Sequence, residues 1–123
     1  MSKTLYGRRF FPYYTFNLVA GLDKNGKGVV HGYDAIGSYG TDRALAQGSG
    51  AHMIIPFLDA EVVGYNNPKH SEKPPLNIPR ATELVYEAFR SAAERDIYTG
   101  DRLEILVVTK DGTQREWRQL RRD

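Results

Sequence analysis

The sequence predicts an α+β fold in which helices pack against antiparallel strands. Two turn dipeptides, Asn25-Gly26 and Asp111-Gly112, each separate two extended stretches, as they do in β-hairpins. Between these hairpins, apolar residues recur with a helical period from Asn77 to Asp96. Because the strands are grouped towards the two ends and do not alternate singly with helices, their order argues against a parallel, doubly wound sheet.

The first hairpin is predicted from Thr15 to Tyr33. Its strands are expected at 15–22 and 28–33, with a type I′ turn at Asn25-Gly26, since that turn needs two residues with positive φ. The glycine-containing stretch 34–42 is then expected to bend into a short strand from Ala44 to Gln47.

A helix is predicted after Gly48-Ser49-Gly50, with Ser49 as its N-cap. Pro56 is expected either to kink this helix or to lie in its first turn, because proline lacks a backbone donor. The polar, proline-containing stretch 63–76 is expected to be a surface loop. The apolar stripe of the helix consists of Met53, Ile54, Phe57 and Leu58.

The second helix has the clearest helical period in the chain. Asn77 is its expected N-cap and Pro79 lies in its first turn. The helix is expected to end between Asp96 and Gly100, where Gly100 supplies a left-handed conformation and the polar side chains of 94–101 satisfy nearby backbone groups. Its buried face is predicted to consist of Ala81, Leu84, Val85, Ala88, Phe89 and Ala92.

The last predicted element is a second hairpin. Its first strand, 103–109, is rich in apolar residues and is expected to be buried on at least one face. The return strand is expected at 113–120, with Trp117 as its large inward residue.

The composition is that of one soluble, folded, intracellular domain. The chain has 123 residues, of which 41% are hydrophobic and 26% charged, which excludes a disordered polymer. It has no cysteine, which excludes disulfides and thiol chemistry. Neither a transmembrane stretch nor a secretory signal is expected. The formal charge of +2 is low for a protein dedicated to binding duplex nucleic acid.

No local motif predicts a metal or cofactor site. His31, His52 and His70 are scattered without metal-ligand spacing. Gly26-Lys27-Gly28 is too short for a phosphate loop. Gly48-Ser49-Gly50 lacks the spacing of a nucleophile elbow, because its glycines directly flank the serine.

The segment from Arg8 to Tyr14 interleaves arginines with aromatic residues. Such a segment can stack the bases of single-stranded nucleic acid. The interpretation we favour is that its rings pack against the core or a partner while the arginines stay in water.

Four motifs together resemble those of proteasome β subunits, in particular non-catalytic members of the β ring of the eukaryotic core particle. They are F-F-P-Y-Y at 10–14, G-L-D-x-x-G-K-G at 21–28, G-S-Y at 37–39 and S-A-A-E-R-D-I-Y-T-G-D at 91–101. The resemblance runs from about Leu5 to Asp123. It implies the four-layer αββα sandwich of the N-terminal-nucleophile hydrolase superfamily. Residues 1–123 would form a single partial domain, the C-terminal half, without the N-terminal strands and the first long helix.

The resemblance also suggests three framework positions of the family's catalytic site. Ser49 matches a serine beside the nucleophile, and Asp96 and Thr99 match an aspartate and a hydroxyl residue of the R-D-x-x-S-G-G motif. The chain departs from that motif at Thr99 and at Asp101. Because no nucleophilic threonine can be located, we expect no catalytic residue, and these positions are interpreted as retained framework.

The implied function is that of a structural subunit that completes the β ring and walls the proteolytic chamber. Its partners would be other α and β subunits, with unfolded polypeptides as substrates of the complex. The expected setting is ubiquitin-dependent degradation in cytoplasm and nucleus, without cofactor, metal, nucleic acid or membrane. Two alternatives remain: part of an active N-terminal-nucleophile amidohydrolase whose catalytic segment is a separate chain, and a single-strand-binding module that uses Arg8 to Tyr14.

Overall fold

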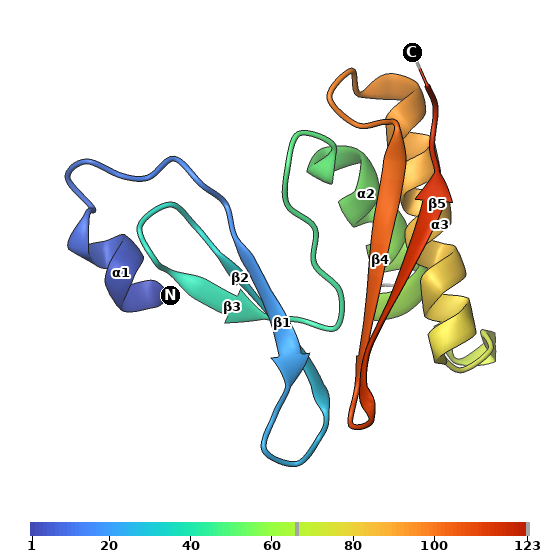
Figure 1. Cartoon of the computed structure of the whole chain (residues 1–123). Helices are drawn as coiled ribbons and strands as arrows, with labels where there is room; N and C mark the ends of the chain where they lie inside the picture. Colours follow the sequence, from blue (N-terminus) through green and yellow to red (C-terminus); the bar gives the residue numbers. More distant parts are fainter. Residues whose placement is uncertain (66, 123) are drawn as a thin grey trace. The chain divides into compact units, whose positions relative to one another are not determined.

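The chain folds into two compact units, residues 1–48 and 49–123, as represented in a computed structural model that describes residues 1–65 and 67–122 (Figure 1). The first unit holds a three-stranded antiparallel sheet, and the second holds two longer helices and a two-stranded sheet. This mixture confirms the predicted α+β class. That residues 1–123 form one partial domain stays a prediction.

The predicted first hairpin is confirmed, but its turn type is wrong. Strands β1 (Leu18–Leu22) and β2 (Gly28–Tyr33) pair antiparallel. In the turn, only Gly26 has a positive φ, of 76°. The reason is the Asp23 carboxylate, whose Oδ1 accepts from the backbone N–H groups of Asn25 at 2.8 Å and Lys27 at 2.9 Å. This side chain stabilises a wider five-residue turn than the predicted type I′.

The strand predicted at Ala44 to Gln47 is wrong, since that stretch is irregular. The third strand is instead β3 (Tyr39–Thr41), which pairs with β2. The chain reverses earlier than expected because the Asp34 Oδ1 accepts from the backbone N–H of Ser38 at 2.8 Å and closes a tight turn.

A short helix that the sequence did not predict, α1 (Ser2–Gly7), lies beside this turn. Its Leu5 is buried, and the Ser2 hydroxyl donates to the Gly37 carbonyl at 2.6 Å. Gly37 has a φ of +90°, and a Cβ there would lie 2.5 Å from the Ser2 carbonyl oxygen. Only glycine therefore fits this contact.

The first helix of the second unit is α2 (Ala51–Leu58), continued by a π-helical turn, η1 (Asp59–Val63). The predicted stripe is confirmed, because Ile54 and Leu58 are buried. Pro56 lies inside the helix and not in its first turn. The predicted loop 63–76 includes residue 66, which lies outside the described residues; the rest of it contains a 3₁₀ turn, η2 (His70–Glu72).

Helix α3 (Ile78–Arg95) matches the prediction closely. Asn77 is the N-cap, and its side chain accepts from the Arg80 backbone N–H at 2.9 Å. Of the six residues predicted for the buried face, Ala88 and Ala92 are buried and the other four are half-buried. Thr82 and Ala93, which were not predicted, are also buried. The helix stop differs from the prediction.

Asp101, with a φ of 59°, and not Gly100, adopts the left-handed conformation after α3. Its backbone is fixed there by Arg121 and Leu120, because the Asp101 N–H donates to the Arg121 carbonyl at 2.8 Å and the Asp101 carbonyl accepts from the Leu120 N–H at 2.9 Å. A tertiary contact thus replaces the expected glycine cap.

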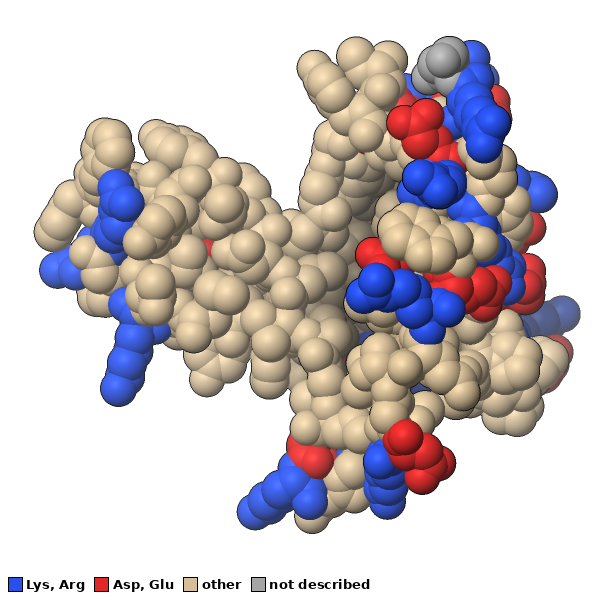
Figure 2. Space-filling view, in the orientation of Figure 1, with Lys and Arg blue, Asp and Glu red and all other residues tan. Residues whose placement is uncertain are grey.

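The second sheet consists of β4 (Arg102–Thr109) and β5 (Gly112–Gln119). One face of β4 is buried against α3: Leu103 and Ile105, only 6% and 7% exposed, form a core cluster with Ala93 and Leu120. The opposite face is uncovered, with Leu106 52% exposed. Figure 2 shows acidic and basic side chains interleaved over this hairpin.

The prediction that Trp117 points inward is wrong. Trp117 is 54% exposed and is the cross-strand partner of Glu104. Directly paired residues share a face of an antiparallel sheet, so Trp117 lies on the face opposite the core cluster. There the Arg102 guanidinium lies 5.6 Å from its ring centroid.

Candidate functional site

The structure brings together the three framework residues that the sequence placed far apart. Ser49 lies just before α2, whereas Asp96 and Thr99 follow α3. The Asp96 Oδ2 accepts from the Ser49 hydroxyl at 2.6 Å and from the Thr99 hydroxyl at 2.7 Å. We call these three residues the hydroxyl–carboxylate cluster.

The turn after α3 positions the carboxylate. The Asp96 N–H still donates to the carbonyl of Ala92 at 2.8 Å, and the Asp96 carbonyl accepts from the Thr99 N–H at 3.2 Å. This turn folds Thr99 back over Asp96. The Asp96 Oδ1 also accepts from the Tyr98 N–H at 3.4 Å, so the carboxylate satisfies backbone as predicted but makes its shorter bonds to hydroxyls.

Gly50 allows the start of α2 to approach the cluster. A Cβ at this buried position would lie 3.3 Å from the Thr99 Oγ1 and 3.4 Å from the Asp96 Oδ2. Gly50 is also the N-cap of α2, without a side-chain cap. The prediction that Ser49 caps this helix is therefore wrong, because its hydroxyl donates to Asp96. The role of Gly50 was missed, although Gly48-Ser49-Gly50 did mark a special backbone.

The cluster holds its carboxylate in the ionised form. The hydrogen bond from Ser49, then that from Thr99, lowers the pKa of Asp96 below its ordinary value, against a smaller opposing effect of desolvation. A carboxylate with a lowered pKa is a weak general base. The geometry therefore ties the two helix ends together better than it activates either hydroxyl.

No group of three metal-ligating side chains occurs in residues 1–65 and 67–122. His31 lies in β2, where its Nδ1 is 2.7 Å from the Thr41 hydroxyl, its cross-strand partner. His52 and His70 lie in α2 and η2. Among the same described residues, no helix combines the length and apolar character needed to cross a membrane.

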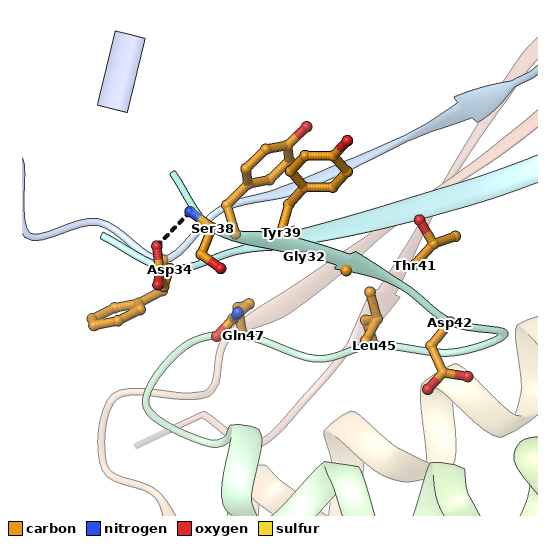
Figure 3. A pocket seen from close by; sticks show the side chains of 11 residues that line it. Gly32, Asp34, Ser38, Tyr39, Thr41, Asp42, Leu45 and Gln47 are labelled. Carbon is orange, nitrogen blue, oxygen red and sulfur yellow. Dashed lines mark hydrogen bonds between the residues drawn. The ribbon is translucent and has the colours of Figure 1, made fainter. Parts of the chain in front are cut away.

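A hollow of about 400 Å³ lies in the first unit, between the strands and the segment 42–47 (Figure 3). Leu45 and Gln47 line one side, and Gly32 and Tyr39 belong to the strands opposite. The carboxylate of Asp34 is held by the turn that it closes. The hollow contains no member of the hydroxyl–carboxylate cluster.

The segment from Arg8 to Tyr14 does not pack on the core of its own unit, so that part of the interpretation is wrong. Phe10 is 88% exposed, and Tyr14 is 82% exposed. Arg8 and Arg9 are exposed, as expected, and each guanidinium also lies over aromatic rings. Packing on a partner stays a prediction.

Comparison with known proteins gives one consistent result. The family described as "Proteasome subunit" matches residues 1–108. The whole chain is 47% identical to proteasome subunit beta type-1-B of Carassius auratus, of which it covers 52%. It is 49% identical to proteasome subunit beta type-1 of Oryza sativa subsp. japonica, of which it covers 57%.

A more distant relative agrees. The chain is 44% identical over 130 aligned residues to proteasome subunit beta type-6 of Saccharomyces cerevisiae, of which it covers 54%. The chain thus spans about half the length of the curated relatives that it matches.

Proposed function

The chain belongs to the proteasome subunit family, and we propose that it acts as a non-catalytic β subunit of the core particle. In this role it completes the β ring together with other α and β subunits and walls the chamber in which unfolded polypeptides are cut. The observation that carries the proposal is the identity of 47–49% to type-1 β subunits along the whole chain.

The hydroxyl–carboxylate cluster does not itself supply an activated nucleophile. The Ser49 proton is committed to Asp96, whose lowered pKa makes it a weak base. Nucleophilic catalysis needs a hydroxyl beside a group that can take its proton. The cluster instead acts as a clip between the start of α2 and the end of α3.

We further propose that the two units are parts of the four-layer sandwich of N-terminal-nucleophile hydrolases. Uncovered surface supports this fold. In the described part of the chain, β4 and β5 form a two-stranded sheet with both edges open and one face exposed. An isolated two-stranded sheet is marginal in water, so further strands and a second layer would complete it.

The proposed setting is ubiquitin-dependent degradation in the cytoplasm and nucleus. The test is to isolate core particles through a tag on this chain and to weigh them by native mass spectrometry. We expect the chain in a fixed ratio to other α and β subunits. Recovery of the chain without any proteasome subunit would contradict the proposal.

The same particles test the absence of catalysis. A covalent inhibitor directed at N-terminal threonines should label other β subunits and leave this chain unlabelled, and Ser49→Ala should leave peptidase activity unchanged. A labelled form of this chain would favour the alternative of an active amidohydrolase. That alternative also predicts a companion polypeptide that begins with Thr, Ser or Cys.

A further inference from the structure

Residues 6–14, which we call the aromatic segment, present large rings to solvent. Phe10, Phe11 and Tyr14 are 88%, 75% and 82% exposed. Tyr14 also has a φ of 52°, which is unusual and costly for a bulky residue. Contiguous exposed apolar surface of this kind marks an interaction site in soluble proteins.

The Arg8 guanidinium rests on two of these rings. It lies 4.5 Å from the ring centroid of Tyr13 and 5.5 Å from that of Phe11. Cation–π contacts at these distances hold the charge close to the apolar surface. The segment therefore presents a cation and rings as one surface.

Arg9 repeats the arrangement, at 4.4 Å from the centroid of Tyr6 and 4.6 Å from that of Phe10. Its Nη1 also donates to the Tyr6 carbonyl at 3.1 Å, which fixes the side chain. Arginine and aromatic residues are the types enriched among the residues that dominate binding at protein interfaces.

The two charges lack an acidic partner within the part of the chain that the structure describes. Residues 1–22 contain no Asp or Glu. The ion pairs among the described residues use Lys73 and arginines from 80 onwards. The space-filling view shows basic side chains and hardly any acidic ones on the surface around α1 (Figure 2).

We propose that the aromatic segment is a docking surface for an acidic patch, flanked by apolar residues, on another subunit of the complex. Carboxylates would pair with Arg8 and Arg9, and apolar side chains would cover the exposed rings. The inference rests on the proposed function, because it assumes that other subunits surround the chain. A protein partner is favoured over single-stranded nucleic acid because both guanidiniums already lie over rings on which bases would stack.

Charge reversal in the assembled complex tests the docking. The full chain carrying Arg8→Glu and Arg9→Glu is expressed in cells, and its share in purified core particles is compared with that of the unchanged chain. The matched control carries Lys24→Glu and Lys27→Glu, the same charge change in the exposed turn of the first hairpin. Placing like charges across an interface strongly disfavours binding, so we expect the Arg variant to fall at least about tenfold while the control stays near the unchanged chain.

Equal incorporation of the two variants would overturn the inference and leave the proposed function intact. Absence of the unchanged chain from the particles would overturn both, and this is seen before any variant is compared. Circular dichroism of the purified chains distinguishes lost docking from misfolding. The spectrum of the Arg8→Glu, Arg9→Glu chain should match that of the control, whereas a misfolded chain would give a different spectrum.

A photo-crosslinking amino acid at Phe10 identifies the occupant in the assembled particle. The expected adduct is a peptide of another subunit with Asp or Glu close to the linked residue. Replacement of those acids by Lys should restore incorporation of the Arg8→Glu, Arg9→Glu chain. Adducts to nucleic acid, or only within this chain, would overturn the inference.

Discussion

Leucines on opposite faces of one strand give a direct test of the second unit. Leu103 and Leu106 both lie in β4, but Leu103 is 6% exposed within the core cluster, and Leu106 is 52% exposed on the uncovered face. Replacing each by alanine removes the same atoms from two different surroundings. The comparison therefore isolates burial from strand propensity.

The expected difference follows from the packing. Each buried CH₂ contributes about 0.8 kcal/mol, and a residual cavity adds to the loss, so Leu103→Ala should lower the free energy of unfolding by about 3 kcal/mol. At Leu106 about half of the side chain is already in water and no cavity forms. Leu106→Ala should therefore cost about 1 kcal/mol or less.

Urea unfolding of the full chain, followed by far-ultraviolet circular dichroism, measures both values. With a slope of about 2 kcal/mol per molar urea, Leu103→Ala should move the midpoint by about 1.5 M and Leu106→Ala by about 0.5 M or less. Both variants are compared at one protein concentration, because association changes apparent stability. Equal shifts would refute the assignment of the buried face of β4.

Four further predictions concern the hydroxyl–carboxylate cluster, one turn, one helix cap and association of the chain. Because the pKa of Asp96 is lowered in the folded state, its carboxylate stabilises the fold above its ordinary pKa, and this stability is lost as the pH falls through the folded-state pKa. Ser49→Ala removes the hydrogen bond that lowers this pKa most, so it should lower the thermal midpoint at neutral pH. The difference in midpoint between the variant and the unchanged chain should shrink below about pH 4. Gly37→Ala should cost about 1–3 kcal/mol in urea unfolding, whereas Gly40→Ala, where a Cβ meets nothing within 4 Å, should be nearly neutral. Asn77→Ala should cost about 1 kcal/mol through the lost cap and should lower the helical signal on heating. The chain by itself should elute above its monomer mass in size-exclusion chromatography with light scattering, because its sheet edges and apolar faces are open, and a monodisperse monomer with a sharp, reversible melt would contradict this.

Local chemistry explains which parts of the fold could be predicted. Helix α3 was predictable because its cap at Asn77 and its apolar period lie within one continuous stretch. The hairpins were predictable from their glycines, but not the turn type, because Asp23 competes for the backbone donors. Helix α1 carries no side-chain cap and only one buried residue, Leu5, so its stability comes from contacts that local pattern does not reveal.

The cluster was predictable only through resemblance. Ser49 and Asp96 are 47 residues apart, and no local spacing predicts that their side chains meet. Gly50 eases this close approach, because a Cβ there would lie 3.3 Å from the Thr99 Oγ1 and 3.4 Å from the Asp96 Oδ2. Sequence alone showed a glycine-flanked serine and a polar helix end, and each had a sufficient local explanation.

Trp117, like the rings of the aromatic segment, is a large aromatic residue that the structure leaves exposed. A large aromatic residue in a strand was expected to be inside. The register instead places Trp117 on the same face of the sheet as Leu106 and Val108, a face that no element of the second unit covers. The hydrophobic effect does not favour a tryptophan and two aliphatic residues on one open sheet face unless another surface closes over them. The failed prediction is therefore informative: one face of β4 serves the core of the second unit, whereas the other face combines the exposed Leu106 and Val108 with the Glu104–Arg115 ion pair.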